Sequence, residues 1–141
     1  MITDRTAGTA LELIRATHAT LHALGRDLAG LHISNSETCV LAILADGRAR
    51  TVGELAGLTA IRPTTLTSVL DRLESRGFAA READPEDRRS YGVLLTRDGR
   101  EVAALAAAAV RDLEERALAS VSDRQLAGFR AVLSGLTEAS R

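Results

Sequence analysis

The stretch that decides the fold is TVGELAGLTAIRPTTLTSVLDRLESRG, residues 51–77. Thr51 and Glu54 form a capping box, in which the hydroxyl accepts from the third helical N–H and the carboxylate reaches back to the cap. Pro63 fits the first position of a second helix, because the N–H that proline lacks would have no partner there. Only residues 59–62 separate the two segments. The stretch therefore predicts a helix–turn–helix.

The second helix of this pair has two chemically different faces. Its apolar residues recur at steps of three and four, which predicts one buried stripe formed by Leu66, Val69, Leu70 and Leu73. The other face carries short hydroxyl side chains and one arginine, which suit close approach to the DNA backbone and to base edges. The alternative interpretation is an ordinary solvated polar face. The candidate DNA contacts on this helix are Arg62, Thr64, Thr65, Thr67, Ser68 and Arg72.

A β-hairpin is predicted directly after the second helix. Residues 78–80 form a short apolar segment, and apolar residues alternate along residues 91–95, as in a strand with one buried face. A helix–turn–helix followed by a hairpin is the layout of a winged helix, whose second helix enters the major groove of DNA. The sequence therefore predicts a mainly α protein with a small β-hairpin wing.

The predicted hairpin tip, DPEDRRS at residues 84–90, is rich in charge. A wing that carries Arg88 and Arg89 can reach the minor groove, whose negative potential attracts arginine. We expect Asp87 to pair with Arg89 and to hold its guanidinium in position. These three residues complete the predicted DNA-contact set.

The predicted DNA-contact segment carries no net positive charge. Residues 62–91 contain six arginines and six acids, so the segment is formally neutral. Any positive face requires Asp71 and Glu74 to point away from DNA, and binding is expected to depend strongly on salt. The alternative function is a winged-helix module that binds protein and not DNA.

Amphipathic helices flank the predicted winged helix. Apolar residues recur in a heptad-like pattern along residues 7–31, and a long Ala-rich helix starts at about Arg97. Two further capping boxes start helices, one formed by Ser34 with Glu37 and one by Ser122 with Gln125.

Composition excludes several classes of protein. The chain has 141 residues, 45% of them hydrophobic but only 2% aromatic, so Leu, Ala, Val and Ile must build the core. One cysteine, Cys39, excludes an internal disulfide and a cysteine zinc finger. There is no membrane-spanning run, signal peptide, phosphate-binding loop, HExxH motif or persuasive catalytic set. We expect a cytoplasmic, non-enzymatic protein without a cofactor.

Three segments together resemble the multiple antibiotic resistance regulator (MarR) family. They are RPTTLTSVLDRLESRGFAARE (residues 62–82), DPEDRRS (84–90) and LLTRDG (94–99). The resemblance implies a homodimeric winged-helix transcription factor, usually a repressor, that binds a pseudo-palindromic operator in double-stranded DNA. It places the recognition helix from about Arg62 and the wing arginines at Arg88 and Arg89. One departure from the family pattern is Arg62, where a small capping residue is frequent.

The resemblance also implies a domain organisation. The chain forms one MarR-like domain, 1–141, in which residues 34–96 make the DNA-binding lobe. Residues 7–31 and 97–141 provide the dimerisation helices. Thr96 is expected to cap the long helix that follows the wing.

Members of the family often bind a small-molecule effector, and some sense oxidation or bind zinc. His18, His22 and Cys39 are the candidate pocket residues. A redox role for Cys39 is disfavoured, because no base lies nearby and its position does not match the family's redox sensors. His18 and His22 share a helix face, but no acidic ligand has a matching spacing, so no metal site is predicted. The low aromatic content disfavours a phenolic effector.

Overall fold

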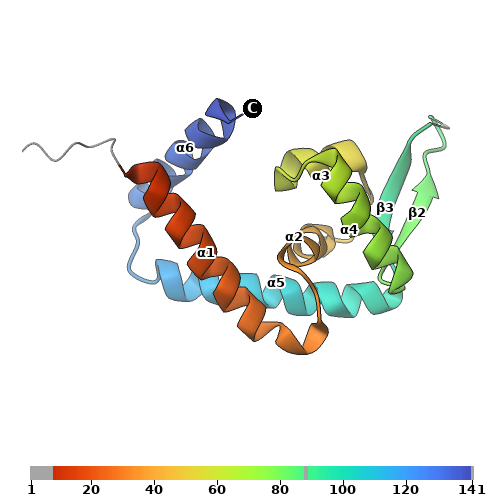
Figure 1. Cartoon of the computed structure of the whole chain (residues 1–141), viewed down its shortest axis with the longest axis horizontal. Coiled ribbons are helices and arrows are strands. Elements are labelled where there is room, and N and C mark those ends of the chain that lie inside the picture. Colours follow the sequence, from red (N-terminus) through yellow and green to blue (C-terminus); the bar gives the residue numbers. More distant parts are fainter. Residues whose placement is uncertain (1–7, 88, 141) are drawn as a thin grey trace, which may run out of the picture. The chain divides into compact units, whose positions relative to one another are not determined.

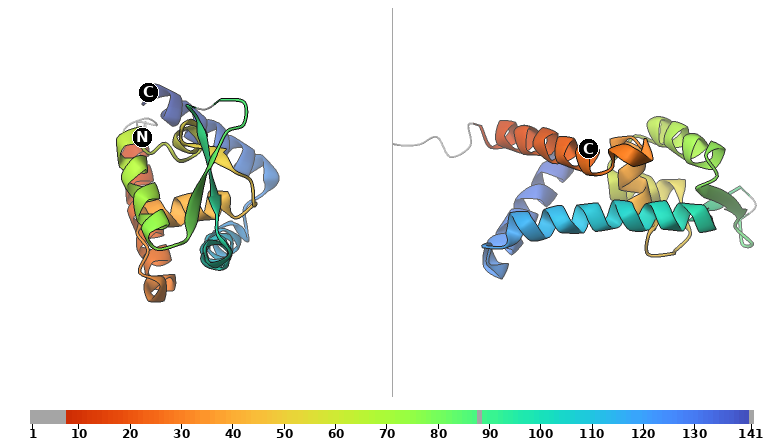
Figure 2. Two further views of the ribbon diagram at one scale, coloured as in Figure 1. Left: turned by 90° about the vertical axis from the view of Figure 1, so that its right-hand side faces the viewer. Right: turned by 90° about the horizontal axis from the view of Figure 1, so that it is seen from below.

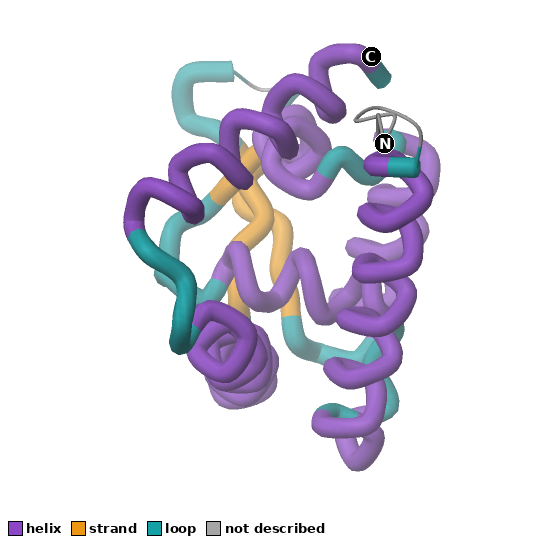
Figure 3. Tube along the Cα trace, turned by 90° about the vertical axis from the view of Figure 1, so that its left-hand side faces the viewer, coloured by secondary structure: helices purple, strands orange, loops and turns teal. Residues whose placement is uncertain are grey.

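The computed structural model describes residues 8–87 and 89–140, and helices make up most of the trace, with the strands confined to one small sheet (Figures 1 and 3). The predicted fold class is confirmed. Residues 1–7, Arg88 and Arg141, which the predicted domain includes, lie outside the described residues. The elements are α1 (Thr9–Asp27), a 3-10 helix η1 (Ala29–Leu31), α2 (Asn35–Leu44), β1 (Arg50–Thr51), α3 (Val52–Thr59), α4 (Pro63–Ser75), β2 (Ala79–Ala83), β3 (Tyr91–Leu95), α5 (Arg97–Leu118) and α6 (Asp123–Ala139).

The chain divides into two compact units, Met1–Arg111 and Asp112–Arg141. The first unit contains α1 to β3 and most of α5, and the second contains the end of α5 and α6. The helix–turn–helix and the wing therefore belong to one unit.

Local capping starts the helices where the sequence predicts. All three capping boxes form, at the starts of α2, α3 and α6. Pro63 occupies the first turn of α4, and Arg62 takes the cap position without a side-chain cap bond. Because each box satisfies two backbone N–H groups, these helix starts depend on residues close in sequence.

The junction between α4 and α5 is tight. Gly77 has φ +74°, and the N–H of Phe78 donates to the Leu73 carbonyl at 2.9 Å, which ends α4 in a Schellman-type turn. Thr96 caps α5 as predicted, since its Oγ1 accepts from the N–H of Gly99 at 3.0 Å. A Cβ on Gly99 would lie 1.7 Å from the Phe78 carbonyl oxygen. The first turn of α5 thus lies directly against the turn that ends α4.

The sheet has three antiparallel strands in the order β1-β3-β2 within the described residues. Ala79 pairs with Leu95 and Ala83 with Tyr91, and the two strands twist about each other (Figure 2). The sequence predicted β2 and β3 but missed β1. A strand of two residues shows no alternation, and Thr51 at its end also caps α3.

The end of the first helix also differs from the prediction. The apolar pattern predicted one helix to Leu31, but α1 ends at Asp27 and η1 follows. His32 then takes a left-handed conformation with φ 52°. Leu28 and Leu31 nevertheless pack on the core, which explains why the apolar pattern continues past the end of the helix.

The core lies where α2, α3, α4 and β3 meet. Its fully buried side chains include Leu41, Leu55, Leu66, Leu70 and Val93. The aromatic side chains Phe78 and Tyr91 are only partly buried at its edge. The prediction of an aliphatic core is confirmed. In the described residues no helix is both long and apolar enough to span a bilayer.

Candidate nucleic-acid interface

The exposed face of α4 carries the predicted recognition side chains. Thr64, Ser68 and Arg72 are four residues apart and exposed, while the opposite stripe is buried in the core. Arg62, Thr65 and Thr67 are exposed as well, although the Thr67 hydroxyl donates within the helix to the Pro63 carbonyl at 2.9 Å. The structure therefore brings all six predicted helix residues to the surface.

The start of α4 offers unpaired backbone donors. The first bond of the helix runs from the N–H of Leu66 to the Arg62 carbonyl, at 2.9 Å. The N–H groups of Thr64 and Thr65 precede it, and no side chain caps this end. Such N–H groups and the helix dipole both favour an anion such as phosphate.

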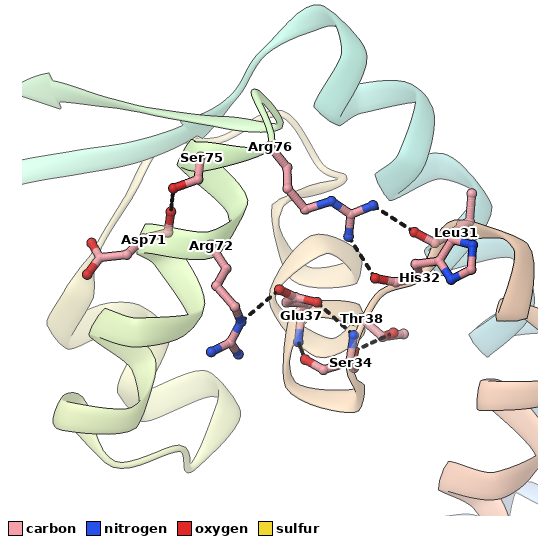
Figure 4. A network of polar contacts seen from close by, with 9 residues as sticks. All are labelled: Leu31, His32, Ser34, Glu37, Thr38, Asp71, Arg72, Ser75 and Arg76. Atoms are coloured by element: carbon pink, nitrogen blue, oxygen red, sulfur yellow. Dashed lines mark hydrogen bonds and ion pairs between the residues drawn. The ribbon is translucent and has the colours of Figure 1, made fainter.

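Arg72 is exposed and yet held by a buried partner. Its Nε donates to Oε1 of Glu37 on α2 at 3.1 Å, and 53% of the Arg72 side chain remains exposed (Figure 4). Burial alone would raise the pKa of Glu37, but the Ser34 N–H together with Arg72 outweighs it and holds the pKa below its ordinary value of 4.5. The pair joins α2 to the recognition face of α4.

Arg76 ties the end of α4 to the connection between α1 and α2. Its two terminal nitrogens each donate at 2.8 Å, one to the His32 carbonyl and one to the Leu31 carbonyl (Figure 4). Its guanidinium also lies over the Phe78 ring, 4.8 Å from the centroid. These contacts fix the C-terminal end of the recognition helix.

Arg81 on β2 links the wing to α4. Its guanidinium contacts Asp71 at 2.6 Å and Glu74 at 3.0 Å, and it lies 4.8 Å from the centroid of the Tyr91 ring. Asp71 and Glu74, whose negative charges would weaken a positive DNA-binding face, are therefore paired with an arginine of the same protein. β2 starts near the C-terminal end of α4 and contacts the helix there (Figure 1).

Within the described residues of the wing tip, Asp87 does not make the predicted contact with the Arg89 guanidinium. Oδ1 of Asp87 accepts from the backbone N–H of Arg89 at 3.0 Å, and no described contact joins Asp87 to the guanidinium of Arg89. A short aspartate side chain bonds readily to the backbone two residues on, which makes a turn. Asp87 thus shapes the loop, and the Arg89 side chain is exposed.

A hollow of about 340 Å³ lies between the start of α3 and the end of the wing loop that leads into β3. It is lined by Thr51, Val52, Gly53, Arg89, Ser90 and Tyr91. The predicted pocket residues lie elsewhere: His18 and His22 are exposed on α1, and Cys39 is half-buried on α2. Burial raises the pKa of the Cys39 thiol. The pocket interpretation stays a prediction.

No group of three His, Cys, Asp or Glu side chains that could hold a metal ion occurs in residues 8–87 and 89–140. The sequence predictions missed three residues that connect elements at this surface: Glu37, Arg76 and Arg81. Glu37 was visible only as part of a capping box. Its partner Arg72 lies 35 residues away, and no local pattern indicates such a contact.

A helix–turn–helix with an exposed polar recognition face and a hairpin wing defines a winged-helix DNA-binding protein. The chain belongs to the MarR family. The family model matches residues 33–91. The HTH-type transcriptional repressor Rv2887 of Mycobacterium tuberculosis is 32% identical over 109 residues, which cover 77% of this chain and 78% of the relative.

Solved structures share the fold. BpsR of Bordetella bronchiseptica, whose DNA binding is regulated by 6-hydroxynicotinic acid, is 22% identical, with a TM-score of 0.77 over 94% of this chain and 95% of BpsR. MepR of S. aureus in its DNA-binding conformation is 19% identical, with a TM-score of 0.83 over 94% of this chain and 99% of MepR. The family model and the 32% identical relative Rv2887 identify the chain as a MarR-family transcriptional regulator.

Proposed function

We propose that this protein is a homodimeric repressor that binds a pseudo-palindromic operator and is released by a small-molecule effector. The observation that carries the proposal is the exposed stripe of Thr64, Ser68 and Arg72 on α4, beside a wing that Arg81 joins to the same helix. These features present a helix and a hairpin to DNA together.

In this proposal α4 enters the major groove and the wing reaches the adjacent minor groove. The hydroxyl residues near the start of α4 approach the backbone and base edges, and Arg72 binds a base. Arg89 and Arg88, the latter outside the described residues, contact the minor groove. The remaining proposed helix contacts are Arg62, Thr65 and Thr67.

Exposed apolar side chains support the dimer. Leu11 and Ile14 on α1 are 61% and 50% exposed, and Phe129 and Val132 on α6 are 51% and 49% exposed. Large apolar side chains clustered along helices mark an interaction surface more often than free surface. We assign residues 7–31 and 97–141 to dimerisation and residues 34–96 to DNA binding.

Repression and effector release rest on similarity. Rv2887 is named a repressor, and the DNA binding of BpsR is regulated by a small aromatic acid. An effector that binds the DNA-free conformation more tightly would shift the population away from DNA binding. His18, His22 and Cys39 are the residues we assign to its pocket.

The decisive experiment measures binding of the purified protein to DNA from upstream of its own gene and to a scrambled duplex, over a salt series. We expect saturable, sequence-selective binding by a dimer, with an affinity that falls steeply as salt rises. Equal weak binding to both duplexes, and to fragments selected from the genome, would favour the protein-interaction module.

A further inference from the structure

Three capping boxes start helices in the described part of the chain. The residue at the third helical position of each box differs in burial and in its contacts. Glu54 and Gln125 are exposed and bond to the backbone of their own caps. Glu37 is only 4% exposed and reaches another helix as well. A capping role alone does not require that burial, since the other two boxes form at the surface.

Both carboxylate oxygens of Glu37 are in use. Oε2 accepts from the N–H of Ser34 at 2.7 Å, and Oε1 accepts from Nε of Arg72 at 3.1 Å. The capping box therefore fixes the carboxylate, and the carboxylate in turn fixes the arginine. Because both partners are charged, this hydrogen bond is stronger than one between neutral groups at the same distance.

The contact leaves the outer part of the guanidinium free. Glu37 binds Nε, the nitrogen nearest the main chain, and the two terminal nitrogens of Arg72 extend away from Glu37 (Figure 4). The planar fork that they form matches O6 and N7 of guanine. With one donor already held, the fork loses less rotational freedom when it binds a base.

We propose that Glu37 is a positioning residue that holds the Arg72 guanidinium in an orientation suited to a guanine edge, and so contributes to sequence discrimination. The inference rests on the proposed function, because it requires α4 to lie in the major groove. It assigns to a residue of α2 a part in reading DNA sequence, through Arg72.

The test compares Glu37→Gln with Glu54→Gln in the full-length protein. Glutamine preserves a capping box, as Gln125 shows, so both variants keep their helix starts and lose one charge. We expect Glu37→Gln to weaken operator binding about five- to tenfold, because the fork is no longer held for its base. Binding of a scrambled duplex should stay the same or tighten, since a negative charge is lost. Glu54→Gln should leave the ratio of the two affinities unchanged.

A double-mutant cycle separates positioning from capping. Arg72→Ala should reduce discrimination, and adding Glu37→Gln to it should cause no further loss. The inference would be overturned if the two substitutions reduced discrimination additively. It would also be overturned if Glu37→Gln lowered the affinity for both duplexes equally, or if it raised the affinity for the operator.

A second variant covers the case in which Glu37→Gln does not fold. Arg72→Lys keeps a cation for Glu37 but lacks the fork, so it should lose discrimination while its thermal unfolding stays close to that of the unsubstituted protein. Full discrimination by Arg72→Lys would contradict the inference. If the unsubstituted protein itself fails to distinguish operator from scrambled DNA, the proposed function fails and the positioning role fails with it. If only the unsubstituted protein's discrimination persists unchanged in Glu37→Gln, the positioning role alone fails.

Discussion

Arg76 and Arg81 each contact two acceptors at once, through separate nitrogens of the guanidinium group. Arg76 uses two nitrogens on two carbonyls, and Arg81 uses two nitrogens on two carboxylates. Lysine has a single nitrogen and cannot reproduce either arrangement. The guanidinium groups therefore connect α4 to the α1–α2 connection and to the wing. The individual surface pairs contribute about 0–1 kcal/mol each, so their main effect is orientation.

Arg89 is expected to contribute to DNA binding without contributing to the core. Its side chain is exposed, and its backbone is held by Asp87. Arg89→Ala should weaken operator binding about tenfold and reduce the salt dependence by about one ion. Fluorescence anisotropy over a salt series measures both quantities.

Arg130→Ala is the matched control for Arg89→Ala, because it removes the same charge from an exposed site on α6. It should leave the affinity nearly unchanged. Equal behaviour of the two variants would show that only net charge matters and would remove the wing contact from the proposal.

Cys39 is expected to react slowly with thiol reagents. The thiolate is the reactive form, and burial raises the pKa of this thiol, so little thiolate exists at neutral pH. A disulfide reagent should modify the folded protein about tenfold more slowly than the protein unfolded in guanidinium. Peroxide should leave operator affinity unchanged. Fast modification with loss of DNA binding would instead support a redox-sensing regulator.

At the scale of elements, the contact between α5 and the end of α4 tolerates no side chain at Gly99. A Cβ there would collide with the Phe78 carbonyl oxygen, which is backbone and cannot rotate away. Gly99→Ala should lower the free energy of unfolding by about 3 kcal/mol, measured by denaturant titration.

Gly57→Ala is the control, because a Cβ on Gly57 in α3 meets nothing within 4 Å. Alanine favours a helix over glycine, so this variant should be more stable by up to about 1 kcal/mol. Similar stability of the two variants would mean that α5 can move away from the Phe78 turn at little cost.

The elements that could be predicted from the sequence are those fixed by neighbouring residues. Capping boxes, Pro63 and Gly77 act within a few positions, so the start of α2 and both ends of α4 were predicted. β1 was missed because its pairing partner lies on β3, about forty residues along the chain. The Glu37–Arg72 pair was missed for the same reason. Hydrophobic periodicity shows which face of a helix is buried, but it does not show which distant residue a side chain contacts.

At the scale of the whole molecule, we expect the exposed apolar side chains of α6 to hold two copies together. Phe129→Glu places a charge in the proposed interface without disturbing a core, so the dimer dissociation constant should rise at least about tenfold. Sedimentation velocity over a concentration series measures it. Arg130→Glu, one residue away and exposed, should leave the dimer intact.

Removing the chain from Ser122 onward provides a second test of the same surface. Without α6 the protein should give monomers or aggregates. A stable dimer after this truncation would show that α6 is dispensable, and α1 and α5 would then have to form the interface alone.

The attachment of the wing to α4 has a consequence for the DNA. The Gly77 turn, the shared core and the two ion pairs of Arg81, with Asp71 and Glu74, hold hairpin and helix at one spacing. In the proposed complex, a duplex whose grooves do not already match that spacing would have to bend or twist to contact both elements. Sequences differ in how easily they deform, and pyrimidine–purine steps deform most easily. We therefore expect operator affinity to depend in part on how easily the duplex deforms, including at base pairs that no side chain contacts.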